Sequence, residues 1–397
     1  MDVDVTESGG GASGWGARAS GTGLIRRRRR RWVRRASLGV GVVALAGLGA
    51  GWAVYAKLDG NITPDEAAAA ELARYESERP SSLVKNARNI LVIGSDTRSG
   101  GENRRYGRDS GTERSDTTIL LHLSAGRRSA TAVSLPRDLM VEVPSCLRPD
   151  GERTEPVFAM FNYAYEMGGS ACSIRTVEKL TGVRIDHHMV VDFRGFKDMV
   201  DAVGGVEVCL REPINDKPAK LRLPAGRVVL DGEQALGYVR ARKSLGNGSD
   251  TDRMERQQRF LGALVNKVQS NDVLLNPARL YPVLDAATSA LTTDPALASL
   301  RGLYQLARGA RDIPTERVQF LTVPRESYVY NPNRDQLVEP EAERLFERLR
   351  TDTPVEVSQK GRPGASEADA RDRHAPSRAS SPAPTFRGNT AAQDGCG

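Results

Sequence analysis

Three short apolar runs between residues 89 and 138 decide the fold: NILVIGS (Asn89–Ser95), TTILLHL (Thr117–Leu123) and ATAVSL (Ala130–Leu135). Each run has the length and the apolar content of a buried strand. Because only a short turn at Ala125–Arg128 links the second run to the third, these two strands are predicted to form an antiparallel hairpin.

Further strands and helices are predicted to alternate along the rest of the chain. The expected helices are Phe158–Met167, Ile174–Leu180, Phe193–Val203 and most of Asn266–Leu349, and the expected strands are His188–Asp192, Val206–Leu210 and Val318–Val323. This order predicts an α/β fold in which helices sandwich a mixed central sheet.

Charged residues stand at the ends of the three early strands. If the first strand runs against the second, then Asp96, Asp116 and Arg137 lie at the same edge of the sheet. Ligands of open α/β sheets bind at such an edge, and two carboxylates with arginines suit a divalent cation and a phosphate group. The alternative is that Arg98 and Asp138 make only local turn and cap contacts with their neighbours.

A second stretch, LDGEQALGYVRARKSLGNGSDTDRMERQQRF (Leu230–Phe260), contains Arg240, Arg242, Arg253 and Arg256. The last two belong to a predicted helix whose polar stripe, with Gln257, continues as an apolar one. Either these arginines pair with their acidic neighbours, or they face an anion such as phosphate in a cleft. The acidic neighbours are Asp231, Asp250, Asp252 and Glu255. This stretch alone leaves both interpretations open.

The basic character of the chain is local. Its net charge is +7, but residues 26–35 hold eight arginines, so the remainder sums to about −1, which argues against nucleic-acid binding by the folded part.

The next segment, LGVGVVALAGLGAGWAVYA (Leu38–Ala56), has no charge and spans about 28 Å as a helix, enough to cross a bilayer. Arginines before this segment and Lys57 after it predict a cytoplasmic N-terminus. A cleaved signal peptide is the alternative, but the long preceding segment favours an uncleaved anchor.

Five regions follow from this reading. They are a disordered basic cytoplasmic tail (1–36), a transmembrane anchor (37–57), a linker or stalk helix (58–83), an extracytoplasmic catalytic domain (84–353) and a disordered tail (354–397).

The cysteines and the missing motifs narrow the chemistry. Cys146 and Cys172 flank one segment in loop-like contexts and are predicted to pair outside the cytoplasm, whereas Cys209 is expected to be a buried free thiol in a strand. His187 and His188 lack the spacing of a metal site with cysteine. The sequence contains no GxSxG elbow, no Walker loop and no GxGxxG after a strand.

Seven segments in order resemble the LytR-CpsA-Psr family, which comprises exported membrane-anchored phosphotransferases of Gram-positive bacteria, and suggest an actinobacterial member. They are NILVIGSDTR (Asn89–Arg98), RSDTTILLHL (Arg114–Leu123), VSLPRD (Val133–Asp138), FNYAYEMGG (Phe161–Gly169), MVDAVGGVEV (Met199–Val208), LDGEQALGYVRAR (Leu230–Arg242) and DTDRMERQQ (Asp250–Gln258).

The resemblance implies a fold with an apolar tunnel for a polyprenyl chain. It also implies transfer of a glycopolymer from a polyprenyl-diphosphate carrier onto peptidoglycan at the cell membrane, with Mg²⁺ as cofactor. The implied metal ligands are Asp96 and Asp116; the implied catalytic residues are Asp96, Arg98, Arg137, Arg240 and Arg242; the implied pyrophosphate-binding residues are Arg114, Arg137, Arg240, Arg242, Arg253 and Gln257. Asp96 is the candidate base for the acceptor hydroxyl.

Two other functions remain open at this point. One is a hydrolase that cleaves the lipid pyrophosphate with water. The other is a non-enzymatic membrane regulator whose residues 26–35 bind nucleic acid. Topology and anionic lipid already explain these arginines, so no nucleic-acid partner is expected.

Overall fold

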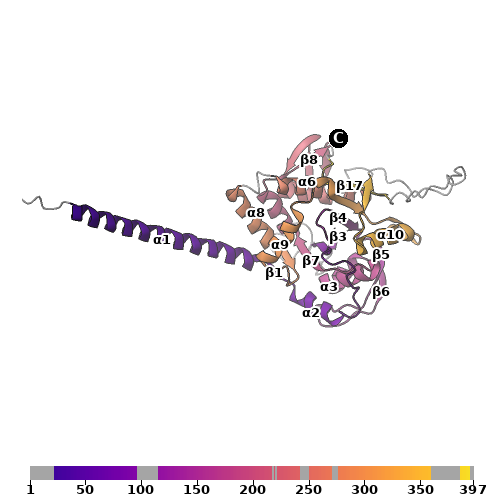
Figure 1. Cartoon of the computed structure of the whole chain (residues 1–397). Helices are drawn as coiled ribbons and strands as arrows, with labels where there is room; N and C mark the ends of the chain where they lie inside the picture. Colours follow the sequence, from indigo (N-terminus) through magenta and orange to yellow (C-terminus); the bar gives the residue numbers. More distant parts are fainter. Residues whose placement is uncertain are drawn as a thin grey trace, which may run out of the picture. The chain divides into compact units, whose positions relative to one another are not determined.

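The computed structural model describes residues 22–95, 115–216, 219, 221–241, 250–270, 276–358 and 385–393. The chain divides into two compact units, Met1–Ala56 and Lys57–Gly397. Each is described by itself below (Figure 1).

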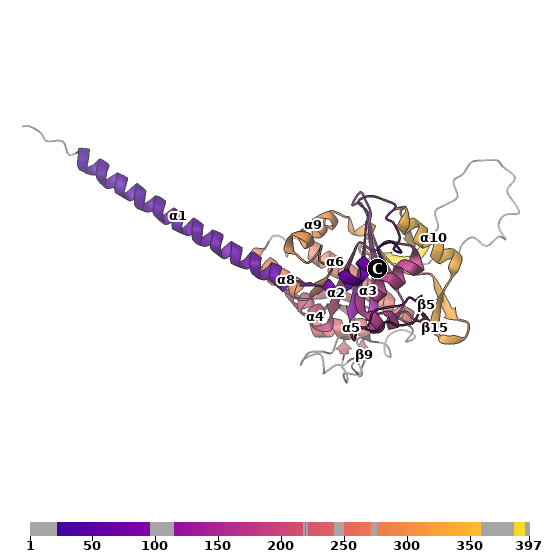
Figure 2. The same cartoon turned by 90° about the horizontal axis from the view of Figure 1, so that it is seen from below.

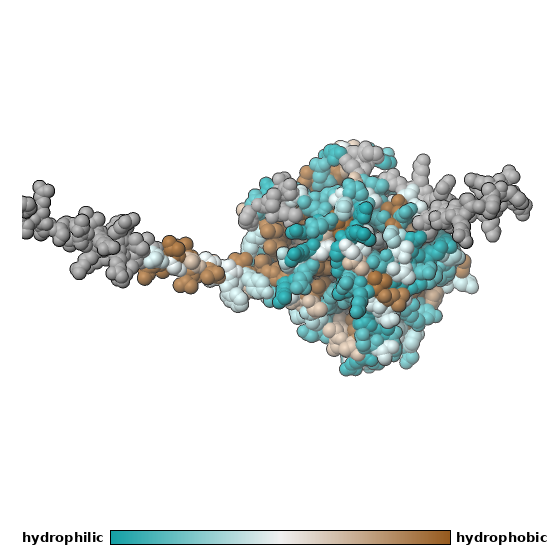
Figure 3. Space-filling model, in the orientation of Figure 1, coloured by the Kyte–Doolittle hydropathy of each residue, from teal (hydrophilic) through white to brown (hydrophobic). Residues whose placement is uncertain are grey.

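The first unit contains most of the long helix α1 (Thr22–Asn61). Within it, Ser37–Asn61 is long and apolar enough to cross a membrane. Leu38 and Val43 are 73% and 72% exposed, and Figure 3 shows apolar residues in brown along this helix. An apolar helix of this length, exposed along the residues described here, agrees with the anchor predicted at residues 37–57.

A nine-stranded mixed sheet forms the centre of the second unit, in the order β1-β12-β7-β2-β3-β4-β13-β17-β16. Its strands are β1 (Thr63–Pro64), β2 (Arg88–Ser95), β3 (Ser115–Leu123), β4 (Ala130–Leu135), β7 (His187–Asp192), β12 (Leu291–Thr293), β13 (Val318–Thr322), β16 (Glu356–Ser358) and β17 (Thr385–Thr390). β3 is antiparallel to β2 and to β4, whereas β7 is parallel to β2 and β13 to β4. The predicted mixed sheet and its early hairpin are confirmed.

Helices cover both faces of this sheet (Figure 1; Figure 2). The helices are α2 (Glu66–Arg74), α3 (Asn162–Thr181), α4 (Phe193–Ala202), α5 (Gly232–Arg240), α6 (Asp250–Gln269), α8 (Pro277–Ser289), α9 (Leu300–Ala310) and α10 (Glu339–Arg350), with a 3₁₀ turn η2 (Thr315–Arg317). Successive side chains of β2 alternate between two cores: Leu91 and Ile93 pack with α2, α3 and α10, whereas Ile90 and Val92 pack with α6 and α9.

Four smaller hairpins complete the fold: β5 (Met140–Val143) with β6 (Val157–Met160), β8 (Val206–Leu210) with β11 (Gly226–Leu230), β9 (Ile214–Asp216) with β10 (Leu221–Leu223), and β14 (Arg325–Tyr328) with β15 (Asn331–Leu337). Two of them correct the predicted secondary structure. Residues 158–160, expected to start a helix, belong to β6, and residues 325–328 and 331–337, expected within a mostly helical region, form β14 and β15. In the second case a turn at Val329 and Tyr330 joins the two strands, and Pro332 disfavours a helix through this segment, so the local sequence outweighs the predicted helix.

The predicted linker at residues 58–83 is part of the folded unit, which corrects the domain boundary expected at residue 84. Leu58 and Ile62 are only 3% and 5% exposed, and β1 pairs with β12. Ala68 and Leu72 of α2 enter the main core. The segment is Ala-rich, and small residues of this kind fit close helix packing as well as a free stalk.

The predicted disordered tail at 354–397 also needs correction, because two of its segments belong to the sheet. β16 pairs with β17, and β17 pairs with β13. A Cβ at Gly388 would lie 2.3 Å from the carbonyl oxygen of Phe320, so this strand approaches its neighbour closely. Backbone pairing holds β17 in place, and hydropathy does not detect such pairing.

The predicted Cys146–Cys172 disulfide is present, with the two Cα atoms 5.5 Å apart. Cys172 lies inside α3 rather than in a loop. Cys209 is half-buried and is also disulfide-bonded, to a partner outside the described residues, so the predicted free thiol is wrong. In an oxidising environment, thiols within reach of one another pair instead of staying reduced.

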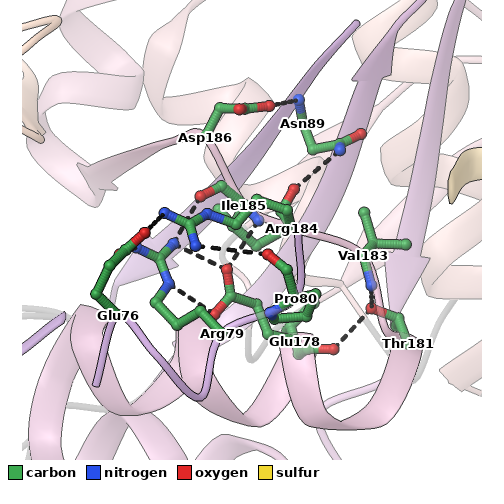
Figure 4. Close-up of polar contacts among 11 residues, drawn as sticks. Glu76, Arg79, Pro80, Asn89, Glu178, Thr181, Val183, Arg184, Ile185 and Asp186 are labelled. Carbon is green, nitrogen blue, oxygen red and sulfur yellow. Dashed lines mark hydrogen bonds and ion pairs between the residues drawn. The ribbon is translucent and has the colours of Figure 1, made fainter. Parts of the chain in front are cut away.

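An ion-pair network joins the segment after α2 to the sheet (Figure 4). Arg79 donates from Nε and Nη2 to the two carboxylate oxygens of Glu178, at 2.9 and 2.8 Å, and from Nη2 to the carbonyl of Ile185 at 2.8 Å. Glu178 accepts in addition from the backbone NH of Ile185 at 2.9 Å. The carboxylate is buried, and several donors satisfy it.

Candidate functional site

Five of the predicted site residues lie in the described part of the structure: Asp116, Arg137, Arg240, Arg253 and Gln257. Asp96, Arg98, Arg114 and Arg242 lie outside the described residues.

The predicted meeting of strand ends is confirmed. Ser95, at the end of β2, pairs with Ser115 at the start of β3, and Leu135, at the end of β4, pairs with Thr118. The parallel neighbours add two more carboxyl ends to this edge, since Asp192 of β7 pairs with Ser95 and Thr322 of β13 pairs with Ser134. The edge therefore collects the ends of five strands, as at ligand sites of open sheets.

Arg137, just after β4, reaches back across the hairpin to β3. Its Nη1 donates to Oδ1 of Asp116 at 2.8 Å, and its Nε lies 3.3 Å from Oδ2 of Asp138. The side chains of Arg137 and Asp116 are 23% and 32% exposed. The local turn contact and the contact across the edge therefore coexist, and both groups remain accessible to a ligand.

Arg240, at the end of α5, reaches the same edge from another direction. Its guanidinium lies over the ring of Phe193, 4.5 Å from the centroid. Phe193 follows directly after Asp192, the last residue of β7. A capping box of Asp231 and Gln234 fixes the start of α5.

Gln257 attaches α6 to the strand ends. Gln257 donates to the hydroxyl of Thr117 at 3.3 Å and to the carbonyl of Val239 at 3.2 Å, which links α5, α6 and β3. Arg253, one turn earlier, is 5% exposed. The predicted polar start of the α6 stripe therefore does reach the site edge.

The sequence reading missed Gln258. Its Nε2 bridges the hydroxyls of Ser134 and Thr322, at 3.1 Å each. The residue is buried and joins the ends of β4 and β13. Its position beside Gln257 was the only signal, because its partners lie far away in the chain.

Arg256 has a different task from the other arginines of its stretch. It is 6% exposed and donates to the backbone carbonyl of Ala241, which directly precedes Arg242. Burial lowers the pKa of Arg256, and the nearby Tyr238 and Asp252 oppose this effect. Arg256 thus fixes the backbone at Ala241, the residue before the predicted site residue Arg242.

The alternative interpretation paired the acidic neighbours with the arginines of Leu230–Phe260, and the structure agrees with it only in part. Asp231 accepts from the backbone NH of Gln234 as a helix cap. Glu255 pairs with Arg259 at 3.4 Å and with Arg387 at 2.8 Å, neither of which was a predicted site residue. Two of the four acidic groups therefore serve contacts outside the predicted clamp.

A second polar layer, also missed by the sequence reading, continues from Arg137 to the β14–β15 hairpin. Arg334 lies 3.3 Å from Asp138, and the backbone NH of Asp335 donates to the Asp138 carbonyl at 3.1 Å. Arg325 pairs with Asp335 and donates to the hydroxyl of Thr251 at 2.7 Å.

Beside this layer lies a polar cavity of about 610 Å³. It is lined by α6, the end of β13, the β14–β15 hairpin and β17, including Arg259, Thr322, Arg325, Asp335 and Arg387. Four elements far apart in the sequence form this hollow next to the strand-end edge.

The donor set suits the implied Mg²⁺ in its chemistry. Within the described part of the chain, no group of three or more metal-ligating side chains occurs. Mg²⁺ needs few protein ligands, because it keeps several waters and binds one or two carboxylates together with substrate phosphates. Asp116, with its partly exposed carboxylate at the edge, is compatible with this mode.

The sequence comparisons agree with the geometry. The model of the LytR_cpsA_psr family matches residues 58–351. The chain is 39% identical over 221 residues to a probable cell wall biosynthesis protein LcpB of Corynebacterium glutamicum, covering 54% of this chain and 50% of that protein. It is 31% identical over 311 residues to the cell wall biosynthesis protein LcpA of the same organism, covering 72% of this chain and 58% of that protein. The chain thus spans between half and three fifths of the length of these two relatives.

A third relative is a polyisoprenyl-teichoic acid–peptidoglycan teichoic acid transferase, TagU of Enterococcus faecalis. It is 31% identical over 255 residues, which cover 64% of this chain and 74% of that protein.

Solved structures share the fold. A LytR-Csp2A-Psr enzyme from Actinomyces oris superposes with a TM-score of 0.53 at 21% identity, covering 68% of this chain and 93% of that one. TagV of Bacillus subtilis superposes with a TM-score of 0.54 at 23% identity, covering 68% and 98%. The family match begins at residue 58, where the folded unit begins. The chain therefore belongs to the LytR-CpsA-Psr family.

Proposed function

We propose that this protein is a membrane-anchored phosphotransferase that moves a glycopolymer from a polyprenyl-pyrophosphate carrier onto peptidoglycan. The observation that carries the proposal is the Arg137–Asp116 pair at an edge that Arg240 and Gln257 also reach. A partly exposed guanidinium beside a carboxylate suits a phosphate group and its charge-balancing cation. The names of the relatives support the choice of glycopolymer and peptidoglycan as substrates.

The proposed reaction is a single displacement at phosphorus. The oxygen of an acceptor hydroxyl on peptidoglycan attacks the phosphorus that carries the glycopolymer. The bond from this phosphorus to the bridging oxygen breaks, and polyprenyl phosphate leaves with the bonding electrons. The hydroxyl proton passes to a carboxylate, for which Asp96 is the candidate.

The arginines stabilise negative charge and take no part in making or breaking bonds. Catalysis of phosphoryl transfer consists mainly of positioning and of stabilising negative charge on the transferring and leaving oxygens. Arg137 and Arg240 reach the edge from a strand end and from a helix end, so a pyrophosphate between them would be held from two sides. Arg98, Arg114, Arg242 and Arg253 are proposed to complete this clamp.

Mg²⁺ is part of the proposal, with Asp116 and Asp96 as its protein ligands. When bound, it would neutralise charge on the pyrophosphate oxygens. Asp116 would then carry two roles, since it also fixes Arg137 at 2.8 Å.

The location of the chemistry follows from the anchor. The arginines before Ser37–Asn61 favour an N-terminus in the cytoplasm and a catalytic unit outside it. A reporter that is active only outside the cytoplasm, fused after residue 90, is expected to be active. Activity of a cytoplasm-only reporter at that position would contradict this orientation.

One assay tests the reaction. The full-length protein in detergent is incubated with a polyprenyl-diphosphate sugar and peptidoglycan fragments, with Mg²⁺ and with EDTA. Sugar phosphate attached to the glycan identifies a transferase, whereas free sugar phosphate alone identifies the hydrolase alternative. Arg242→Ala is expected to lose activity on the order of 10²–10³-fold with little change in melting temperature. A stable and fully active Arg242→Ala protein would remove this residue from the clamp.

A further inference from the structure

Two exposed aromatic side chains and a half-buried one between them gather on the β14–β15 hairpin and the neighbouring β6. We call Phe158, Tyr328 and Tyr330 the aromatic patch. The ring centroids of Phe158 and Tyr328 lie 6.1 Å apart, and those of Tyr328 and Tyr330 lie 5.4 Å apart, edge to face. Tyr330 is 85% exposed and Phe158 is 53% exposed. Aromatic rings that cluster in solvent mark an interaction surface.

The patch belongs to the same hairpin that contacts the candidate site. Arg334 of β15 lies 3.3 Å from Asp138, whose other carboxylate oxygen lies 3.3 Å from Nε of Arg137. Leu139 forms a bridge with Asp335. β15 begins at Asn331, directly after Tyr330, and a strand advances about 3.4 Å per residue, so this end of β15 lies roughly 10 Å along the strand from Arg334. A long ligand could therefore contact the patch and the site at once.

Planar polar groups lie on the same hairpin as the two tyrosines, where Asn331 is paired with Tyr328 and Gln336 with Glu326. Gln336 accepts from the backbone NH of Val329 at 3.3 Å and donates to Glu326 at 2.8 Å. Asn331 accepts from the backbone NH of Asn333 at 3.0 Å. The two amides and the carboxylate are already oriented, so they offer hydrogen-bonding groups beside apolar ring faces.

This combination matches a saccharide better than a membrane. A sugar ring presents C–H groups on its faces and hydroxyl or acetamido groups around its rim, so its recognition needs both aromatic surface and planar polar partners. A contact with anionic lipid would need a cluster of basic side chains. Here the two nearby arginines, Arg325 and Arg334, are paired with Asp335 and Asp138.

We propose that the aromatic patch binds the glycan strand of the peptidoglycan acceptor. This inference rests on the proposed function, because it assigns a place to the second substrate of that reaction. The lipid donor brings a pyrophosphate that arginines hold, whereas the acceptor strand is bound through neutral sugars. Stacking on Tyr330 and Phe158 would supply the positioning that charge does not.

The first test measures binding without any donor. Soluble glycan strands released from peptidoglycan are titrated into the full-length protein in detergent by calorimetry. Tyr330→Ala and Phe158→Ala are each expected to weaken binding about tenfold, and Tyr330→Leu to behave like Tyr330→Ala, because stacking needs the ring. Tyr330→Phe should bind as the unchanged protein does. Tyr304→Ala on α9 removes a similarly exposed tyrosine, 60% accessible, and should have no effect.

The second test uses the transfer assay. Tyr330→Ala should raise KM for the glycan about tenfold and leave KM for the lipid donor and kcat unchanged. If the unchanged protein does not bind the glycan, the proposed role of the aromatic patch is wrong. The same holds if both alanine variants bind the glycan as tightly as the unchanged protein does. Photo-crosslinking from position 330 in proteoliposomes to lipid but not to glycan would also overturn it, in favour of a membrane contact.

The two proposals fail in different ways. Loss of glycan binding in Tyr330→Ala together with no transfer by the unchanged protein would keep the patch and reject the transferase. Transfer by Tyr330→Ala with an unchanged KM for the glycan would reject the patch and keep the transferase.

Discussion

Two arginine–carboxylate pairs in this protein use the same chemistry for opposite purposes. Arg79 and Glu178 have side chains only 10% and 2% exposed, and backbone groups of Ile185 complete their hydrogen bonds (Figure 4). Arg137 and Asp116 are 23% and 32% exposed, and they meet at an edge where five strands end. The first pair is buried inside the fold, and the second is partly open to solvent.

The difference shows how to separate a structural ion pair from a functional one. A sealed pair is costly to break, since the remaining charge stays buried. An accessible pair contributes little to stability, because water replaces the lost partner. Mutation of the first should therefore affect folding, and mutation of the second should affect activity.

The largest effect is expected for Arg79→Ala. Removing the guanidinium leaves the Glu178 carboxylate buried without its main partner, which should cost about 3–5 kcal/mol of unfolding free energy. Thermal unfolding of the full-length protein in detergent would show a melting temperature roughly 10 °C lower. If Arg79→Ala melts like the unchanged protein, the network is not a structural element and the comparison collapses.

Arg137→Ala should lose activity rather than stability. The expected loss of transfer rate is on the order of 10²–10³-fold, because a contact with developing charge disappears. Arg137→Lys keeps the charge but not the planar fork and should fall between the two. The measurement is the transfer rate together with the melting temperature. A large drop in melting temperature would show that Arg137 is structural after all.

Acid should weaken the fold at a third carboxylate, Asp65, the cap of α2. Burial raises the pKa of Asp65, but hydrogen bonds from His188 at 3.1 Å, from Ser170 and from the NH of Ala68 outweigh it and lower the pKa to about 2. A carboxylate with a depressed pKa in the folded state stabilises the fold above its ordinary pKa, and this stability is lost as the pH falls through the folded value. The contribution is roughly 2 kcal/mol and should disappear between about pH 4 and pH 2.

Asp65→Asn provides the matched measurement for this pH dependence. Its unfolding free energy should lie below that of the unchanged protein at neutral pH, and the two should converge towards pH 2. Parallel curves over this range would mean that Asp65 does not titrate differently in the folded protein.

The smallest effect is expected beside Glu178, at the next residue of α3. Lys179 pairs with Glu142 at 2.8 Å, but the two side chains are 50% and 69% exposed. Solvent screens such a pair, so Lys179→Ala should leave the melting temperature and the transfer rate unchanged. This variant is the control for Arg79→Ala. Each substitution removes the cation of one ion pair that involves α3, and the two pairs differ in burial. A loss as large as that of Arg79→Ala would show that burial does not distinguish the pairs.

Local sequence was sufficient for the central hairpin and for the position of the candidate site. NILVIGS, TTILLHL and ATAVSL are apolar runs of strand length, and the short turn between the last two permits only an antiparallel pairing. That pairing places Asp116 and Arg137 at one edge without knowledge of any distant contact. The amphipathic start of α6 put Gln257 on a stripe whose polar residues need partners, and in the structure it contacts Thr117 at the same edge.

Tertiary contacts determine the structure of two segments for which the composition gave a wrong prediction. Residues 58–83 look like a stalk, yet Leu58 and Ile62 are buried against distant segments. The tail has little apolar content, yet β17 pairs with β13 through its backbone, and this pairing does not depend on hydropathy.

The sequence by itself determined the long apolar helix, the early strands and the charged residues at their ends, because each depends on neighbours within a few positions. Only the tertiary structure decided which arginines are sealed and which are accessible, since burial is set by elements far apart in the chain. The residue type alone does not distinguish Arg256 from Arg137. One is enclosed between α5 and α6 and holds the carbonyl of Ala241, and the other stands at the open edge beside Asp116. The same guanidinium binds backbone in one place and is partly open to solvent in the other, because packing decides how much water reaches it.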